Sequence, residues 1–568
     1  MKREIDCDVL VVGSGAAGLS AAVTARHAGL EVLVAEKAPV LGGTTAWSGG
    51  WLWIPGNAPA RRAGVEDSAE AARAYLRDEL ADAYDAALVD AYLEHGPRMV
   101  DFFEAHTTVR FVPGVATPDF HPDSAGSAVG RPVCAAPIDG RELGRLIDLL
   151  RPPLQEITLG GMSIAAGADL KHFMNARRSL PSAWHVAKRL TRHAFDTLVH
   201  GRSMHLVNGN ALAARLIKSA DALGVVFRVA SPVRELLRDV DGRIAGAVLM
   251  TPQGAQTVRA RRGVVLACGG FPHDVERRRE LFPLAPTGAE HWSAAPQENS
   301  GDGLRLAEAV GARVKADIPS PAAWIPVSRV PRPDGSHGVF PHLIDRAKPG
   351  VIAVLKNGRR FANESDSYHD VGRAWLAASA AAGLKTVEAF LLCDHRAIRR
   401  YGLGFAKPFP IPLGPYLKSG YLVSAPSIAA LAERLGIEAA GLSATIERYN
   451  HDARRGEDPE FGRGKSAFNR VSGDATVAPN PCVAPVEHGP FYAVRLLPGS
   501  LGTFAGLPTD ASARVLGEGR RPIPGLYAVG NDMHSVMGGH YPSGGITLGP
   551  AMTFGYLAGL HLAGTPPG

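Results

Sequence analysis

Short, continuous apolar runs recur along the chain, and three of them end directly at a glycine. Residues 7–12 (CDVLVV), 263–268 (GVVLAC) and 524–529 (PGLYAV) have the length of buried strands. Because their apolar residues do not alternate with polar ones, they are typical of strands buried on both faces of a parallel sheet. The small and apolar residues 19–28 indicate a helix after the first run. The pattern therefore predicts an α/β protein built on a Rossmann-like sheet.

A different pattern occupies residues 171–202, which carry seven lysines and arginines but a single acid, Asp196. At helical spacing, one face collects apolar side chains and the other faces are basic. The apolar face holds Trp184, Ala187, Leu190, Ala194 and Leu198, and the others hold Lys188, Arg189, Arg192 and His193. Two interpretations stay open: a helix packed on its own protein with a solvated basic side, or a helix lying on an anionic membrane. No nucleic-acid motif accompanies the charge, so nucleic acid is not an expected partner.

The length of 568 residues exceeds one hydrophobic core and predicts two to four domains. No apolar run reaches the roughly 20 residues that cross a bilayer, and neither end has the pattern of a targeting peptide. We therefore expect a cytoplasmic protein, associated with the inner face of the membrane if residues 171–202 bind lipid. The five cysteines lie far apart without a Cys-x-x-Cys pair, so we expect free thiols, no disulfide and no metal site.

The first apolar run is followed by Gly13-Ser14-Gly15-Ala16-Ala17-Gly18, a strand, glycine turn and helix in order. Gly13 permits a tight turn, Gly15 lets the backbone approach a pyrophosphate, and Gly18 lets the helix close on the strand. A second strand, residues 31–35, ends at Glu36, whose carboxylate can bond ribose hydroxyls. This context predicts a dinucleotide site formed by Gly13, Gly15, Ala16, Ala17, Gly18, Glu36 and Lys37.

A second glycine-rich stretch, residues 41–50 (LGGTTAWSGG), supplies more amides and hydroxyls than a nicotinamide cofactor needs. A longer, folded-over cofactor such as FAD fits this stretch better. The other two apolar runs add glycine turns of their own, at residues 269 and 530. The further candidate cofactor residues are Gly42, Gly43, Thr44, Thr45, Ser48, Gly49, Gly50, Ala267, Gly269, Gly530 and Asn531.

Taken in this order, the motifs from residue 8 to residue 560 resemble the FAD domain of the fumarate reductase and 3-ketosteroid dehydrogenase superfamily. The resemblance implies that Gly530-Asn531 contacts the ribityl-phosphate part and that a helix beginning near Ile546 points at the pyrimidine edge of the flavin. It adds Gly544, Ile546 and Leu548 to the cofactor contacts. Residues 42–50 contain no histidine for covalent attachment, so we expect non-covalent FAD.

The resemblance also implies the domain organisation. We expect a discontinuous Rossmann-like FAD-binding domain, residues 1–319 and 489–568, with a basic insertion at about 151–205. An α+β catalytic cap domain, residues 320–488, interrupts it. Proline and glycine breakers near both junctions are consistent with these boundaries.

Two motifs indicate the branch of the superfamily. Residues 541–545 (YPSGG) resemble the Tyr-Pro-Gly-Pro-Gly segment of 3-ketosteroid 1-dehydrogenases, which implies that the Tyr541 hydroxyl and the Gly545 amide bind a ketone oxygen. The fumarate branch carries a carboxylate-binding arginine there. Residues 357–368 (NGRRFANESDSY) resemble the cap motif whose last tyrosine is the base, which implies that role for Tyr368. Arg360 and Glu364 are expected to pair structurally.

One position departs from the branch. Its members have a third tyrosine after a Pro-Asp, and residues 117–122 (TPDFHP) place Phe120 there. Phe120 has no hydroxyl, so either another group such as His121 assists Tyr368, or the substrate differs from a 3-ketosteroid. We expect both residues to line the substrate pocket.

The resulting hypothesis is an FAD-dependent desaturase that introduces a double bond next to a ring ketone, and the resemblance favours 3-ketosteroid 1-dehydrogenation. A smaller cyclic ketone, or fumarate- or enoate-type reduction, are the enzymatic alternatives. A flavoprotein that only carries electrons is a third. An external electron acceptor, a quinone or another oxidant, must reoxidise the flavin.

Overall fold

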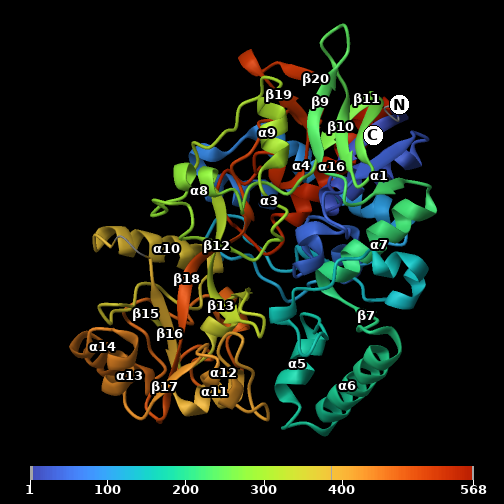
Figure 1. Ribbon diagram of the computed structural model, residues 1–568. Coiled ribbons are helices and arrows are strands. Elements are labelled where there is room, and N and C mark those ends of the chain that lie inside the picture. The colour runs from blue at the N-terminus through green and yellow to red at the C-terminus, as the bar shows by residue number, and fades with distance from the viewer. Residues whose placement is uncertain (1–3, 385–386, 566–568) are drawn as a thin grey trace.

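The computed structural model describes residues 4–384 and 387–565, and two large β-sheets lie toward opposite ends of it (Figure 1). The first has eight strands in the order β19-β20-β11-β1-β2-β8, with β10 paired to β11 and β9 paired to β10. Its strands are β1 (Glu4–Val12), β2 (Val32–Ala35), β8 (Val226–Arg228), β9 (Val233–Arg238), β10 (Ile244–Thr251), β11 (Gly254–Leu266), β19 (Arg514–Leu516) and β20 (Pro522–Ala528).

The apolar runs form the parallel centre of this sheet. Strand β1 lies between β2 and β11, and β20 adds to the far side of β11, all in parallel. Helix α1 (Ala16–His27) packs against α16 (Leu548–Ala563), where a Cβ on Gly555 would lie 2.4 Å from the Ala17 carbonyl oxygen. This close approach explains the small residues of both helices, and the predicted strand-turn-helix unit is confirmed.

The second sheet has seven strands and is mostly antiparallel. Its order is β14-β13-β18-β16-β15, and both β12 and β17 also pair with β18. Its strands are β12 (Trp292–Ser293), β13 (Ala322–Pro331), β14 (His337–Pro341), β15 (Val351–Leu355), β16 (Ala389–Cys393), β17 (Val423–Ala425) and β18 (Phe491–Thr503). A parallel sheet beside this second, α+β unit agrees with the expected fold class, while the exact domain boundaries stay a prediction.

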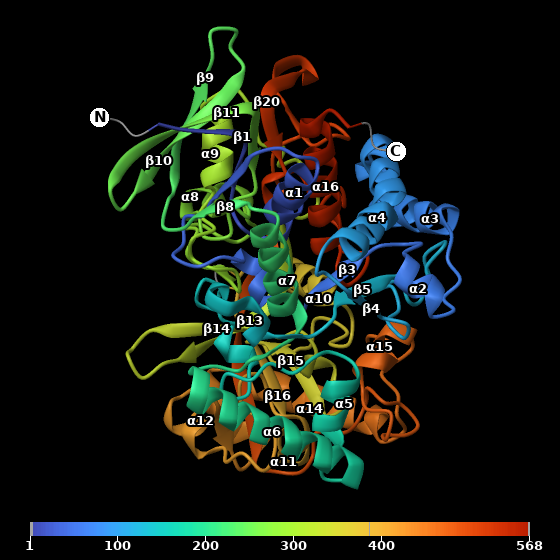
Figure 2. The same ribbon diagram turned by 90° about the vertical axis from the view of Figure 1, so that its right-hand side faces the viewer.

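Small sheets and helices surround the two large ones (Figure 2). Strands β3 (Trp51–Trp53), β4 (Phe111–Pro113) and β5 (Pro132–Ala135) form one small sheet, and β6 (Ile138–Asp139) pairs with β7 (His205–Leu206). The other helices are α2 (Ala58–Arg62), α3 (Ala69–Leu80), α4 (Ala86–His106), α5 (Ala168–Asn175), α6 (Leu180–His200), α7 (Asn208–Ala222), α8 (Val275–Leu281), α9 (Asp302–Glu308), α10 (Tyr368–Ala381), α11 (His395–Tyr401), α12 (Gly414–Lys418), α13 (Ile428–Leu435), α14 (Ala439–Ala453) and α15 (Ala467–Ser472).

A buried ion network holds the second unit together. The Arg360 guanidinium donates to both carboxylate oxygens of Glu364, at 2.8 and 2.6 Å, and to Asp458 at 2.8 Å. Arg463 donates to Glu364 as well, at 3.1 Å. Because these side chains are buried, loss of one partner leaves an uncompensated charge, which typically costs about 3–5 kcal/mol. The expected structural pairing of Arg360 with Glu364 is confirmed.

Helix α6 differs from the interpretation in which its apolar face packs on the protein. Its buried positions are Ser182, Arg189 and Asp196, whereas Leu180, Trp184 and Leu198 are 87%, 74% and 86% exposed. Arg189 donates to the Ser163 carbonyl oxygen, and Asp196 accepts from the Met204 amide. The helix therefore binds its own chain through its polar face and turns its apolar face to solvent.

Helices α5 and α6 lie beside each other at the end of the molecule opposite the two termini (Figures 1 and 2). Within the described ranges, no helix combines the length and apolarity required to span a bilayer.

Candidate active site

The glycine turn after β1 has the geometry of a nucleotide-binding loop. Gly13 has a φ of +109°, and a Cβ there would lie 2.2 Å from the Ala267 carbonyl oxygen. A Cβ on Gly18 would lie 2.2 Å from the Gly13 carbonyl oxygen. By contrast, a Cβ on Gly15 would meet nothing closer than the Thr45 hydroxyl at 3.6 Å. Gly13 and Gly18 thus serve tight packing, while the space beside Gly15 is open to a ligand.

The acid at the end of β2 faces the same loop. Glu36 is buried, and its carboxylate accepts from the amide and hydroxyl of Ser14, at 3.0 and 2.6 Å, and from the Ala38 amide at 2.9 Å. The adjacent Lys37 points elsewhere, because its ammonium group pairs with Asp302 at 2.7 Å. Lys37 was predicted to contact the cofactor, but its side chain is engaged with Asp302 instead.

The second glycine-rich stretch folds over the first as a short 3-10 helix, η1 (Gly43–Trp47). The Thr45 hydroxyl accepts from the Ala16 amide at 2.9 Å, which joins the two predicted loops directly. Thr44 accepts from Asn299, a residue that the sequence interpretation missed because it lies in a loop without a recognisable motif. Ser48 has a structural contact as well, since its carbonyl oxygen accepts from the Gly209 amide. Gly42, Gly49 and Gly50 belong to the same stretch and lie on either side of η1.

A second missed residue, Asp532, follows Gly530 and Asn531. It is fully buried and accepts from the amides of Cys268, at 2.6 Å, and Gly270, at 2.9 Å. Burial raises the pKa of Asp532 to about 6. The carboxylate thereby fixes the loop after β11, where Ala267 and Gly269 lie, against the end of β20.

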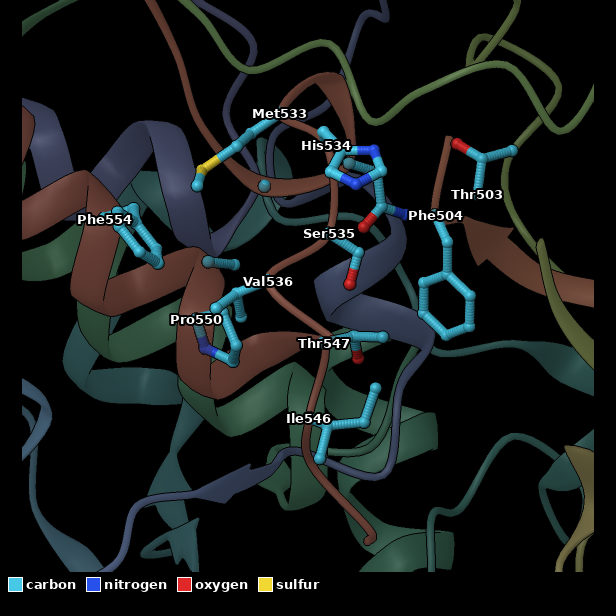
Figure 3. Close-up of a pocket in the computed structure, with 13 residues that line it drawn as sticks. Thr503, Phe504, Met533, His534, Ser535, Val536, Ile546, Thr547, Pro550 and Phe554 are labelled. Atoms are coloured by element: carbon cyan, nitrogen blue, oxygen red, sulfur yellow. The ribbon is translucent and has the colours of Figure 1, made fainter. Parts of the chain in front are cut away.

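A pocket opens between the segment after β20 and the start of α16 (Figure 3). Three expected cofactor residues, Gly530, Asn531 and Ile546, line it. His534 lines it too, and its Nδ1 atom is buried without a hydrogen-bond partner in the described part of the chain. Tyr368 and Tyr541 are not among its lining residues, although the ring of the lining residue Phe504 lies 6.0 Å from that of Tyr541. Its orphaned polar atom and the open space at Gly15 fit a bound dinucleotide.

The three aromatic residues singled out in the sequence meet in one cluster. The rings of Tyr368 and Tyr541 are edge to face, with centroids 5.0 Å apart. Phe120 stacks on Tyr541, with centroids 5.8 Å apart and planes 10° apart, and lies edge to face with Tyr368 at 5.8 Å. Three aromatic residues that are more than 170 positions apart in sequence thus pack against one another.

Gly545 follows Tyr541 by four residues, and its backbone packs against Trp51 to Trp53. Its φ is +104°, and a Cβ would lie 2.6 Å from the Trp53 nitrogen, so only glycine fits. Its carbonyl oxygen accepts from the amides of Trp53 and Gly549, at 3.1 and 2.9 Å. Its own N–H donates to no acceptor in the described part of the chain. Leu548, expected as a cofactor contact, is the first residue of α16 and lies one turn further on.

The loop that carries Phe120 is anchored to the loop of Tyr541. The Pro542 carbonyl oxygen accepts from the Phe120 amide at 2.9 Å and from the Tyr75 hydroxyl at 2.6 Å. Asp119 is buried between the Trp53 indole N–H, at 2.7 Å, and the Arg131 guanidinium, at 2.7 Å. These contacts fix the position of the Phe120 ring against Tyr541.

Burial sets the protonation of the two tyrosines. It raises the pKa of Tyr541 to about 12, and it raises the pKa of Tyr368 well above its ordinary value, an effect to which Tyr541 adds. The buried Arg346 guanidinium works in the opposite direction on Tyr368. His369 supplies no charge, because burial lowers its pKa to about 3 and its Nδ1 accepts from the Trp324 amide at 3.1 Å.

His121 does not take the place of the absent tyrosine hydroxyl. Its two ring nitrogens lie 2.5 Å from Glu79 and 2.9 Å from Asp370, and no hydrogen bond joins it to Tyr368 within the described residues. Its ring is therefore engaged with two carboxylates, and its expected place in the substrate pocket stays a prediction.

Proteins of known family resemble this chain over most of its length. The model of a family described as FAD binding domain matches residues 8–548. This chain belongs to that FAD-binding family. It is an FAD-dependent oxidoreductase, and the α/β fold class expected from the sequence is confirmed.

Within the FAD-binding family, relatives cover nearly the whole chain. A 4-oxocyclohex-2-ene-1-carboxylate 5-dehydrogenase of Sinomonas cyclohexanicum is 41% identical over 99% of this chain and 94% of its own. A 3-oxosteroid 1-dehydrogenase of Mycolicibacterium smegmatis is 37% identical, over 98% and 97%. The crystal structure of 3-ketosteroid delta1-dehydrogenase from Sterolibacterium denitrificans, in complex with 1,4-androstadiene-3,17-dione, superposes with a TM-score of 0.91 at 36% identity, covering 98% and 99%. The chain thus belongs to the 3-ketosteroid dehydrogenase-like branch.

Proposed function

We propose that the protein desaturates a ring ketone at the carbon–carbon bond next to the carbonyl group. The observation that carries this proposal is the meeting of two buried phenols, Tyr541 and Tyr368, whose ring centroids are 5.0 Å apart. The N–H of Gly545, four residues after Tyr541, has no acceptor among the described residues and supplies a second candidate donor. Two donors beside one candidate base match the needs of a ketone better than those of a dicarboxylate, which requires a fixed cation.

The roles of the residues follow from their chemistry. Tyr541 and Gly545 donate to the ketone oxygen and stabilise the negative charge that develops as the α-carbon loses its proton. Tyr368 accepts that proton. When bound, the FAD supplies the hydride acceptor for the adjacent carbon. Since burial keeps the Tyr368 phenol protonated, it must first lose its own proton, and the buried Arg346 guanidinium favours this loss.

The residues that would hold FAD come from five segments. The loop of Gly13 to Gly18 and Glu36 would contact the adenosine diphosphate part. The stretch from Gly42 to Gly50, the turn at Gly530 and Asn531, and the start of α16 would contact the remainder. Non-covalent binding is part of the proposal.

The substrate class is a neutral or carboxylated cyclic ketone. A 3-ketosteroid is supported by the solved relative, and a 4-oxocyclohexanecarboxylate-type ring is supported by the relative that is 41% identical. Phe120 adds an apolar surface where the steroid branch carries a hydroxyl. An external electron acceptor, a quinone or another oxidant, completes the cycle.

Anaerobic mixing tests the proposal. The oxidised, yellow protein is mixed with 4-androstene-3,17-dione, with 4-oxocyclohexanecarboxylate, with cyclohexanone and with succinate, and the visible flavin absorbance is followed. We expect bleaching by a ring ketone and a new double bond beside the carbonyl group of the product. Reduction by succinate alone would indicate the fumarate-type alternative, and no reduction by any of the four would contradict the desaturase.

We further propose that α6 docks on the inner face of an anionic membrane. Its apolar side chains Leu180, Trp184 and Leu198 face solvent, and the exposed Lys188 lies on the same helix, whereas the nearby Arg192 is paired with Asp139 at 2.7 Å. Exposed apolar rings and chains beside cations match a lipid surface, which offers both an apolar interior and negative headgroups. Phe409, which is 44% exposed and lies under the Arg177 guanidinium, extends this surface toward the second unit.

A sedimentation experiment checks the membrane contact. At low salt we expect the protein to pellet with phosphatidylglycerol vesicles more than with phosphatidylcholine vesicles, and high salt should release it. The double variant Trp184→Glu/Leu198→Glu should reduce binding to the level seen with neutral vesicles. Val240→Glu, at a fully exposed position in the turn between β9 and β10, is the matched control and should bind as the wild type does. Failure of the wild type to pellet at low salt would contradict the proposal.

A further inference from the structure

An ionic bridge behind the aromatic cluster joins the two halves of the active site. His121 Nδ1 lies 2.5 Å from Glu79 Oε2, on α3, and His121 Nε2 lies 2.9 Å from Asp370 Oδ2, on α10. With carboxylates on both nitrogens, both ring positions act as donors, so the ring is an imidazolium. Neither nitrogen is left to exchange protons with the substrate.

We propose that His121 is a positioning residue that, as an imidazolium held between Glu79 and Asp370, fixes the first turn of α10 and thereby the Tyr368 phenol opposite Tyr541. The inference rests on the proposed function, because it matters to catalysis only if Tyr368 is the base.

The route from His121 to Tyr368 is short. Ser367 is the N-cap of α10: its hydroxyl accepts from the Asp370 amide at 3.1 Å and donates to the Asp370 carboxylate at 2.5 Å. Tyr368 is the next residue and the first of the helix. The same Asp370 oxygen, Oδ2, thus accepts from the N-cap hydroxyl of α10 and from the imidazolium. Loss of the bridge would free the first turn of α10, which carries the Tyr368 phenol.

The other end of the bridge is equally anchored. Glu79 lies in the last turn of α3 and also accepts from the Ser124 hydroxyl at 2.5 Å. The His121 amide lies 3.4 Å from the Tyr75 hydroxyl, which itself donates to Pro542 beside Tyr541. Phe120 and His121 are adjacent in the chain. This short segment therefore holds the Phe120 ring against Tyr541 and, through His121, holds Asp370 in the first turn of α10.

Because His121 must be protonated to pair with both carboxylates, the strength of the bridge depends on pH. Burial opposes the charged ring, but the hydrogen bonds and charges of Asp370 and Glu79 outweigh it and raise the pKa of His121 to about 10. Asp366, His369 and His540 also interact electrostatically with the ring. Because the folded-state pKa lies above the ordinary value, the stabilisation is complete below about pH 6.5 and is lost as the pH rises through 10.

The test compares His121→Gln, which keeps hydrogen-bonding capacity without charge, with His121→Arg, which keeps a permanent charge. At saturating ketone and pH 8, His121→Gln should lower the rate constant of flavin reduction at least tenfold, with FAD retained and the dissociation constant of the ketone within threefold of wild type. His121→Arg should recover to within threefold of wild type at pH 8, and its rate should keep rising with pH through 10, where deprotonation of His121 makes the rise in the wild type level off. His451→Gln, at an exposed histidine paired with Asp452 on α14, is the matched control.

A decrease of less than threefold in His121→Gln, or equal decreases in His121→Gln and His121→Arg, would overturn the inference. A second readout needs no substrate. In protein labelled with ¹⁵N-histidine, the resonance absent from His121→Gln should report a doubly protonated ring at pH 8, and a neutral ring would also overturn it. If the His121 ring is doubly protonated but no ketone reduces the flavin, the proposed function has failed and the charge state inferred for His121 stands.

Discussion

Tyr368→Phe is expected to retain FAD and to lose flavin reduction by the ketone about 10²- to 10⁴-fold, the range typical of removing a general base. The ring keeps its edge-to-face contact with Tyr541, so only the hydroxyl is lost. In the wild type the rate should rise with pH over the neutral range, because burial raises the pKa of Tyr368 and the phenolate fraction grows with pH. The variant should lack this rise. Anaerobic stopped-flow absorbance at saturating ketone measures both effects.

Tyr401→Phe is the matched control for this variant. Tyr401 is a partly buried tyrosine of the second unit whose hydroxyl donates to Asp474 at 2.8 Å, away from the aromatic cluster. Its variant should reduce at the wild-type rate. A Tyr368→Phe protein within tenfold of wild type would reject Tyr368 as the base and turn attention to another acceptor for the α-proton.

Tyr541→Phe is expected to lower the rate constant of flavin reduction about 10²- to 10³-fold, the usual cost of losing one donor to a developing oxyanion. The effect should fall on the rate constant more than on ketone binding, because the hydrogen bond strengthens as charge develops on the oxygen. Exchange of the ketone's α-protons with deuterated solvent should slow by a similar factor. Stopped-flow absorbance and NMR of the recovered ketone give the two values.

The control here is Tyr527→Phe. Tyr527 lies in β20, is buried, and has its hydroxyl 2.9 Å from His561 Nδ1, on the nucleotide side of the molecule. It should leave both rates unchanged. If Tyr541→Phe weakened ketone binding but left the saturated rate constant unchanged, Tyr541 would be a binding group and the oxyanion role would fall to Gly545 alone.

The strand, glycine turn and helix of the nucleotide half could be predicted from the sequence because they are contiguous in the chain. Gly18 is required by its contact with the Gly13 carbonyl oxygen, five residues earlier, whereas the atom that excludes a side chain at Gly13 is the distant Ala267 carbonyl oxygen. The positions of Tyr368 and Tyr541 followed from motifs. Asn299 and Asp532 could not be predicted in the same way, because their partners, Thr44 and the loop after β11, are more than 200 residues away.

Helix α6 shows where the pattern alone was ambiguous. An amphipathic repeat states that two faces differ, and it does not state which face meets the protein. Here the protein offers polar partners, the Ser163 carbonyl oxygen and the Met204 amide, so Arg189 and Asp196 turn inward. His121 was similar: its proximity to Phe120 was visible in the sequence, while its two carboxylate partners came from distant helices.

The order of the strands has a consequence for biosynthesis. Strand β20 supplies the parallel neighbour of β11, and α16 packs on α1, so the nucleotide half is completed by residues 514–563. Until that segment leaves the ribosome, the apolar edge of β11 and the outer face of α1 lack their cover, and Tyr541 and Gly545 have not yet been synthesised. Capture of the cofactor and assembly of the catalytic cluster are therefore late events, and apolar surface of the nascent chain stays uncovered until the last segment is made.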